Sequence, residues 1–165
     1  MTVAVYPGSF DPVTCGHLDI VRRAVGLFDR LVVAVLVNPR KSPLLTVEER
    51  VALVRRSVDE TLGPDASRIA VEAFDGLTVE FCRARGATSI VRGLRVISDF
   101  ETELQLAHNN RRLAPDVDTV FFMTALEHSY ISSSLVKEIA LFGGNVDAMV
   151  PPAVAARLAT AFRPS

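Results

Sequence analysis

Residues suited to binding phosphate stand at four points where a strand-like segment of the sequence ends. The first is the loop at residues 7–17, in which two glycines and two hydroxyl side chains precede His17 at the start of a predicted helix. The free backbone N–H groups and dipole of a helix N-terminus attract phosphate, and glycine allows the backbone to approach closely. The same residues are also compatible with an ordinary loop and a histidine on a helix surface.

Three other segments carry cations or hydroxyls at equivalent positions. They are Asn38-Pro39-Arg40-Lys41, Arg92-Gly93-Leu94-Arg95, and the run Ser132-Ser133-Ser134 at the start of a helix. One guanidinium group can donate hydrogen bonds to two phosphate oxygens at once, and it keeps its positive charge. Each segment has a simpler interpretation, which is a solvated turn, ion pairs from the arginines to Asp99 and Glu101, or helix capping by serine.

Alternating strand-like and helix-like segments predict how these loops are positioned. Strands are expected at residues 3–6, 31–37, 69–74, 89–91 and 119–123, and the nearly unbroken aliphatic run at 31–37 is typical of a buried parallel strand. The pattern predicts an α/β fold, a single-domain Rossmann-like open sheet of five mostly parallel strands with helices on both faces, spanning residues 1–165. Ligands bind at the carboxyl edge of such a sheet, so the four segments should converge there.

Capping-box spacing predicts where two of the helices begin. Thr46 and Glu49 stand three residues apart ahead of an apolar helical pattern, as do Ser98 and Glu101, whose helix should run to about Leu113.

Composition excludes several classes of protein. The chain has 165 residues, of which 49% are hydrophobic and 22% charged, which excludes intrinsic disorder. A net charge of −1 predicts no nucleic-acid partner and no membrane partner, and the lack of a long apolar run or signal segment predicts a cytoplasmic protein. Two cysteines and three scattered histidines predict neither a disulfide framework nor a structural zinc site.

The combined set of side chains predicts phosphoryl or nucleotidyl transfer. It offers hydroxyls, a histidine, a lysine, two arginines and two helix N-termini, without an obvious pair of nucleophile and base. In such reactions the protein mainly positions the reactants and stabilises charge. The dinucleotide-binding fingerprint is missing after the first predicted strand, which argues against a dehydrogenase, and the P-loop motif is missing too.

Two motifs resemble the signatures of the nucleotidyltransferase superfamily. These are Pro7-Gly8-Ser9-Phe10-Asp11-Pro12 with Thr14-x-Gly16-His17, and Ile131-Ser132-Ser133-Ser134. Within that superfamily nearly the whole chain resembles the bacterial phosphopantetheine adenylyltransferases. The resemblance includes Arg92–Arg95, Asp99–Glu101, Glu103–Ala107 and Ser132–Glu138.

The resemblance implies a reaction and its partners. ATP and 4′-phosphopantetheine would give dephospho-coenzyme A and pyrophosphate, with Mg²⁺ bound by the ATP phosphates and without dedicated protein ligands. It also implies a homohexamer and feedback inhibition by coenzyme A.

Roles carry over from the family to matching positions. The catalytic positions are Ser9, His17, Lys41 and Arg92. The phosphopantetheine positions are Ser9, Lys41, Leu77, Thr78, Arg92 and Asn110. The ATP positions are Ser9, Phe10, His17, Gly93, Leu94, Arg95, Glu103, His128, Ser129, Tyr130, Ile131, Ser132, Ser133 and Ser134. Thr78, Thr102 and Asn109 differ from residues common at these positions in the family. The resemblance implies that these differences bear on the fit of the ligand and on the subunit contact, and that they remove no phosphate ligand.

Two other functions remain open from the sequence. One is a non-catalytic nucleotide-binding module, which would bind ATP without releasing pyrophosphate. The other is an adenylyl- or cytidylyltransferase acting on another acceptor, such as nicotinamide mononucleotide. The stretch at residues 92–107 and the three serines favour phosphopantetheine, and the presence of Lys41 and Arg92 favours an enzyme.

Overall fold

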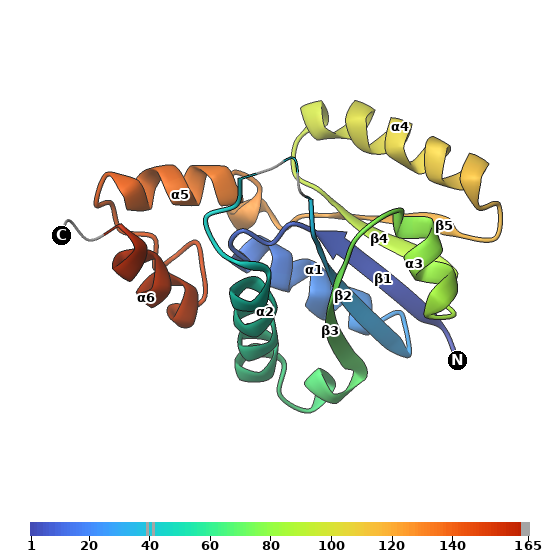
Figure 1. The fold of residues 1–165 in the computed structure, drawn as a ribbon, viewed down its shortest axis with the longest axis horizontal. Helices are drawn as coiled ribbons and strands as arrows, with labels where there is room; N and C mark the ends of the chain where they lie inside the picture. The colour runs from blue at the N-terminus through green and yellow to red at the C-terminus, as the bar shows by residue number, and fades with distance from the viewer. Residues whose placement is uncertain (39, 41, 163–165) are drawn as a thin grey trace.

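Within the part of the chain that the structure describes, five parallel strands form one sheet in the order β3-β2-β1-β4-β5 (Figure 1). The computed structural model describes residues 1–38, 40 and 42–162. The strands are β1 (Val3–Gly8), β2 (Arg30–Leu36), β3 (Ile69–Phe74), β4 (Ser89–Leu94) and β5 (Asp118–Met123). The predicted α/β class is confirmed, and the strands, expected to be mostly parallel, all pair in parallel.

Helices cover both faces of the sheet, as predicted (Figure 1). On one face lie α1 (Cys15–Val25), α2 (Val47–Leu62) and α6 (Pro152–Ala161), with α5 (Ser133–Leu141) packed against α6. On the other face lie α3 (Thr78–Ala84) and α4 (Ile97–Leu113). Short 3₁₀ helices occupy Gly63–Arg68 and Leu126–His128. None of the helices in the described residues is both long enough and apolar enough to cross a membrane.

Strands β1 and β4 separate toward their carboxyl ends. β1 stays paired with β2 along its whole length, from Val3 with Arg30 to Gly8 with Val35. It pairs with β4 only at Ala4 with Ser89 and at Val5 with Ile90. These two strands lie where the chain order reverses, and open α/β sheets bind their ligands at such points.

Pro7 lies inside β1, although the sequence predicted that the strand would end before it. Its carbonyl accepts a hydrogen bond from Arg92 Nη1 of β4 at 3.1 Å, while Pro7 and Gly8 continue in register with β2. Because proline has no N–H, Pro7 cannot donate a ladder hydrogen bond toward β4. A side chain therefore takes the place of strand pairing at this position.

One of the two predicted capping boxes is confirmed. The Thr46 hydroxyl accepts from the Glu49 N–H at 3.2 Å, and Glu49 Oε2 accepts from the Thr46 N–H at 2.8 Å. The box predicted at Ser98 is wrong, because α4 begins at Ile97 and its N-cap is Val96, with φ −137° and ψ 163°. A capping residue has non-helical backbone, whereas residue 98 already lies within the helix.

The single-domain prediction can be tested at α6, the last helix. Leu158 is 1% exposed and belongs to the core that α1 and α2 share. We expect Leu158→Ala to lower the free energy of unfolding by about 2–5 kcal/mol, because it leaves a cavity in that core. Urea unfolding would show one shifted transition, and Leu27→Ala, at a residue 67% exposed, is the control. A separate early transition for the C-terminal part would contradict a single domain.

Candidate active site

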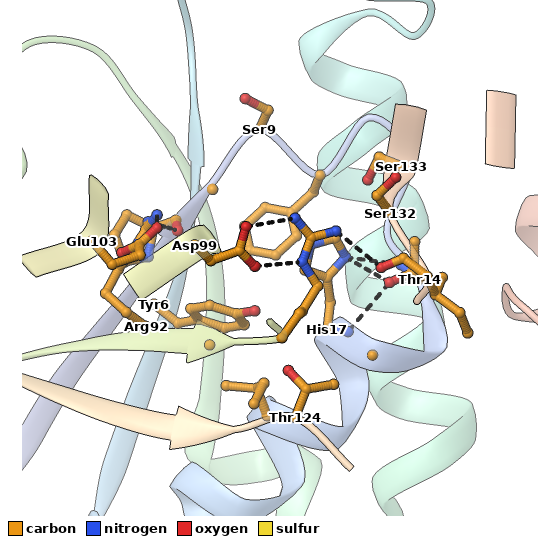
Figure 2. A pocket seen from close by; sticks show the side chains of 18 of the residues that line it. Tyr6, Ser9, Thr14, His17, Arg92, Asp99, Glu103, Thr124, Ser132 and Ser133 are labelled. Carbon is orange, nitrogen blue, oxygen red and sulfur yellow. Dashed lines mark hydrogen bonds and ion pairs between the residues drawn. The ribbon is translucent and has the colours of Figure 1, made fainter. Parts of the chain in front are cut away.

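A cavity of about 330 Å³ opens where β1 and β4 separate (Figure 2). Its walls come from the end of β1 and the following loop, the start of α1, the end of β4, the first half of α4 and the start of α5. The predicted site residues that line it are Ser9, Phe10, His17, Arg92, Gly93, Arg95, Glu103, Ile131, Ser132, Ser133 and Ser134. Three of the four segments singled out in the sequence therefore meet at one point.

The remaining predicted ATP residues lie next to the cavity without lining it. Leu94 is buried at the end of β4, and Tyr130 is 79% exposed. The Ser129 hydroxyl donates to the Leu126 carbonyl at 2.8 Å. His128 is packed close to Gly16, and its Nδ1 is buried without a partner among the described residues.

The predicted phosphopantetheine residues divide into two groups. Ser9 and Arg92 line the cavity, whereas Lys41 lies outside the described residues. Leu77 is the N-cap of α3, Thr78 begins that helix, and Asn110 belongs to α4. Because α3 and α4 contact each other on one face of the sheet, these three residues would extend the site along that face.

His17 is fixed by a reciprocal cap at the start of α1. The Thr14 hydroxyl accepts from the His17 N–H at 3.3 Å, and the Thr14 N–H donates to His17 Nδ1 at 3.0 Å (Figure 2). A backbone N–H can only donate, so Nδ1 must be unprotonated. The ring proton therefore resides on Nε2, and a neutral His17 remains able to donate a hydrogen bond.

Burial keeps this imidazole neutral. Desolvation, followed by the positive charges of Arg95 and Arg92, lowers the pKa of His17 from 6.5 to about 4. The ring also packs edge-on to Phe10, at 5.0 Å between centroids. At physiological pH His17 is thus a hydrogen-bond donor that carries no charge.

The two arginines are held by carboxylates of α4. Arg92 Nε and Nη2 donate to the two oxygens of Glu103 at 2.7 and 2.5 Å, and Arg95 Nε donates to Asp99 Oδ2 at 3.1 Å. Burial disfavours the charged form of Arg92, but the hydrogen bonds and the negative charge of Glu103 together outweigh burial and raise the pKa of Arg92. Both guanidinium groups stay charged and oriented, and each retains N–H groups beyond those used by its carboxylate.

The loop after β1 has a tightly constrained backbone. Phe10 has a positive φ of 47° while its side chain is only 2% exposed. A Cβ at Gly8 would lie 3.0 Å from the Phe10 ring, so a larger residue at this position would have to displace that buried ring. Such constraint is common where a loop presents groups to a ligand, and here it places Ser9 at the edge of the cavity.

Sequence reasoning missed some of the residues that line the cavity. Thr124 directly follows β5, so the rule that found the other strand ends could have found it. Tyr6 lies inside β1, where the sequence shows only an apolar strand; burial raises the pKa of its hydroxyl. Asp99 was considered only as an ion-pair partner of the arginines, and that pairing with Arg95 is present.

Comparison with known proteins agrees with this geometry. A family model described as cytidylyltransferase-like matches residues 5–139, so fold and site define the chain as a nucleotidyltransferase of that class. A phosphopantetheine adenylyltransferase of Heliobacterium modesticaldum is 54% identical over 159 residues, covering 96% of this chain and 92% of the relative. The relative of that name from Caldanaerobacter subterraneus subsp. tengcongensis is 50% identical, with both chains fully covered. The chain belongs to the phosphopantetheine adenylyltransferase family.

The fold also matches a solved structure of more distant sequence. A nicotinic acid mononucleotide adenylyltransferase of Plasmodium falciparum, complexed with NaAD, superimposes with a TM-score of 0.73. The alignment covers 96% of this chain and 95% of the other, at 14% sequence identity. This likeness concerns the fold alone.

The protonation state of His17 can be tested by NMR of the ¹⁵N-labelled histidines. We expect the ring to stay neutral, with its proton on Nε2, as the pH falls from about 8 to about 5, because its pKa of about 4 lies below that range. The exposed His108 serves as the internal control. Unfolded chains bind a proton near pH 6.5, so this residue destabilises the fold increasingly as the pH falls from there toward 4. Titration of His17 near neutral pH would contradict the assignment.

Proposed function

We propose that this cavity transfers the AMP group of ATP to 4′-phosphopantetheine, giving dephospho-coenzyme A and pyrophosphate. The observation that carries the proposal is the meeting of a neutral histidine donor, two oriented arginines and the serines of α5 at the point where β1 and β4 separate. Family membership supports this choice of acceptor, since the relatives are named phosphopantetheine adenylyltransferases.

In the proposed reaction, an oxygen of the acceptor phosphate forms a bond to the α-phosphorus of ATP. The bond from the α-phosphorus to the oxygen that bridges the α- and β-phosphates breaks, and its electron pair leaves with pyrophosphate. The attacking phosphate is already anionic, so no strong base is needed. Ser9 would contact both phosphates, while Arg92, with Lys41, would hold the acceptor phosphate.

His17 would act on charge that develops during the transfer. Its Nε2–H would donate to a non-bridging oxygen of the α-phosphate, which becomes more negative in the transition state. The Thr14 cap supports this role because it fixes the tautomer before substrate binds. A donor oriented in advance needs no reorganisation as the reaction proceeds.

Mg²⁺ fits the site as a companion of the nucleotide. Within residues 1–38, 40 and 42–162, no three histidine, cysteine or acidic side chains are grouped to hold a metal, and Asp99 and Glu103 are both paired with arginines. Magnesium commonly binds to substrate phosphates and water. The ion would supply positive charge to the phosphates, and the hydroxyls of Ser9 and Ser133 lie in the same cavity.

The proposal extends to assembly and feedback. The protein would form a homohexamer, which is supported by apolar side chains on α4 that the single chain leaves exposed, including Phe100 at 46%, Leu106 at 43% and Leu113 at 54%. Coenzyme A would compete with the acceptor because both contain the pantetheine arm. A cytoplasmic location remains a prediction from the sequence.

The reaction is tested by measuring pyrophosphate release from ATP and Mg²⁺ with different acceptors. We expect release with 4′-phosphopantetheine and background release with nicotinamide mononucleotide or with no acceptor. Release with nicotinamide mononucleotide instead would favour the other acceptor class. Binding of ATP without release for any acceptor would favour a nucleotide sensor.

Replacing His17 tests its role in the transition state. We expect His17→Ala to lower the turnover number by about 10²–10³, with little change in ATP affinity, as for the loss of one oxyanion donor. Steady-state kinetics and ATP titration measure the two quantities, with His108→Ala as the control. An unchanged turnover number would remove His17 from the mechanism.

Replacing Arg92 tests the acceptor clamp. We expect Arg92→Ala to weaken 4′-phosphopantetheine binding by about 10–100-fold, because a charged hydrogen-bond donor contributes about 1.5–3 kcal/mol. Arg111→Ala, in the same helix as Glu103 and at an exposed ion pair, is the control. If the parent protein bound pantetheine without its phosphate equally tightly, the clamp would be refuted.

A further inference from the structure

Arg50 is a buried arginine of α2 that lies outside the site described so far. The residue is 3% exposed, and no carboxylate in the described part of the chain lies within ion-pair distance of its guanidinium. Its Nε is buried without a hydrogen-bond partner among the described residues. Removing an unpaired charge from water is costly, so the hydrogen bonds that hold this guanidinium must compensate for its burial.

The hydrogen bonds of Arg50 Nη1 end on backbone carbonyls beside the cavity. Nη1 donates to the Ser9 carbonyl at 2.7 Å and to the Leu36 carbonyl at 3.1 Å. The parallel pairing of β1 with β2 ends one residue before each of these carbonyls, at Gly8 with Val35. Arg50 therefore extends the connection between the two strands by one residue beyond their last paired positions.

The Ser9 carbonyl belongs to the peptide group that joins Ser9 to Phe10. Phe10 has a positive φ of 47°, which is sterically unfavourable for a residue with a side chain. Such a conformation persists only where the surrounding structure restrains it. The bond from Arg50 restrains this peptide group directly, because turning the group would move its carbonyl away from Nη1.

Arg50 is the second arginine that holds a carbonyl near the end of β1. Arg92 of β4 donates to the Pro7 carbonyl at 3.1 Å, and Arg50 of α2 donates to a carbonyl two residues further along the chain. Arg92 lines the cavity between β1 and β4, whereas Arg50 is not among the described residues that line it. We therefore expect Arg50 to affect this cavity through the residue that it holds.

We propose that Arg50 is a positioning residue, which holds the Ser9 carbonyl and thereby sets where the Ser9 hydroxyl lies. Ser9 lies on the loop after β1, at the edge of the cavity (Figure 2). The inference rests on the proposed function, in which Ser9 contacts both reacting phosphates. Displacement of a contacting group by about 1 Å can lower a rate by about 10², so Arg50 contributes to turnover without touching either substrate.

A double-mutant cycle with Ser9 separates positioning from a general effect on the fold. The turnover number is measured by pyrophosphate release in the parent, Arg50→Met, Ser9→Ala and the double variant, with saturating ATP, Mg²⁺ and 4′-phosphopantetheine. Methionine keeps an apolar stem but offers no donor to the two carbonyls. We expect Arg50→Met to lower the turnover number at least about tenfold in the parent. In the Ser9→Ala background the loss should be less than about twofold, because the hydroxyl that Arg50 positions is absent.

Arg55→Met is the matched control on the same helix. Arg55 Nη2 donates to the Val71 carbonyl of β3 at 3.0 Å, so this variant also removes a bond from an arginine to a strand carbonyl. It should lower the free energy of unfolding in urea and leave the turnover number unchanged. Arg50→Lys retains a charged donor, so its turnover number should fall less than that of Arg50→Met. If Arg50→Met fails to fold, Arg50→Lys takes its place in the same cycle.

Titration of the same four proteins with ATP, in the absence of an acceptor, repeats the cycle without the transfer reaction. Arg50→Met should weaken ATP binding in the parent and leave it unchanged in the Ser9→Ala background. That result, in a protein that releases no pyrophosphate with any acceptor, would keep the positioning role and refute the proposed reaction. Release by the parent, with effects of Arg50→Met that are absent or equal in the two backgrounds for both quantities, would overturn the positioning role and leave the reaction in place.

Discussion

The separation of β1 from β4 beyond the Val5–Ile90 pair is the constraint on which the rest of the site depends. Pro7 has no N–H to offer toward β4, and Arg92 hydrogen-bonds to its carbonyl instead. The gap leaves room for the loop after β1, and the end of β4 and the start of α1 both line the cavity there. Without that separation, the two strands would continue to pair and there would be no cavity between them.

Within this opening, electrostatic preorganisation follows from short-range hydrogen bonds. A helix cap fixes the tautomer of His17, and the carboxylates of α4 orient the two arginines. Burial, and after it the charges of the same arginines, lower the pKa of His17, so the cations that would attract phosphate also help to keep the histidine neutral. A neutral donor in the same cavity as two permanent cations is suited to stabilising charge on a phosphate without exchanging a proton with it.

Much of this arrangement was predictable from the sequence, because parallel strands place their carboxyl ends at one edge. That rule alone predicts that Ser9, His17, Arg92 and Ser133 lie together, and they line one cavity. It could not predict that Arg50 is buried, because the sequence shows this residue only as a charged position in an amphipathic helix. Its burial depends on carbonyl groups 14 and 41 residues away, and such contacts are set by tertiary packing. The start of α4 was misplaced for a related reason, since local spacing matched a capping box that the backbone did not adopt.

The proposed function depends on transfer of AMP to a phosphate acceptor in the cavity between β1 and β4. Its most direct test is the fate of a label carried by the α-phosphate of ATP, followed by mass spectrometry in the presence of 4′-phosphopantetheine and Mg²⁺. We expect all transferred label to appear in dephospho-coenzyme A and the pyrophosphate to be unlabelled. Label in the released pyrophosphate, or a product that carries phosphate without adenosine, would show that a different bond is broken. Either result would contradict the proposed transfer of AMP.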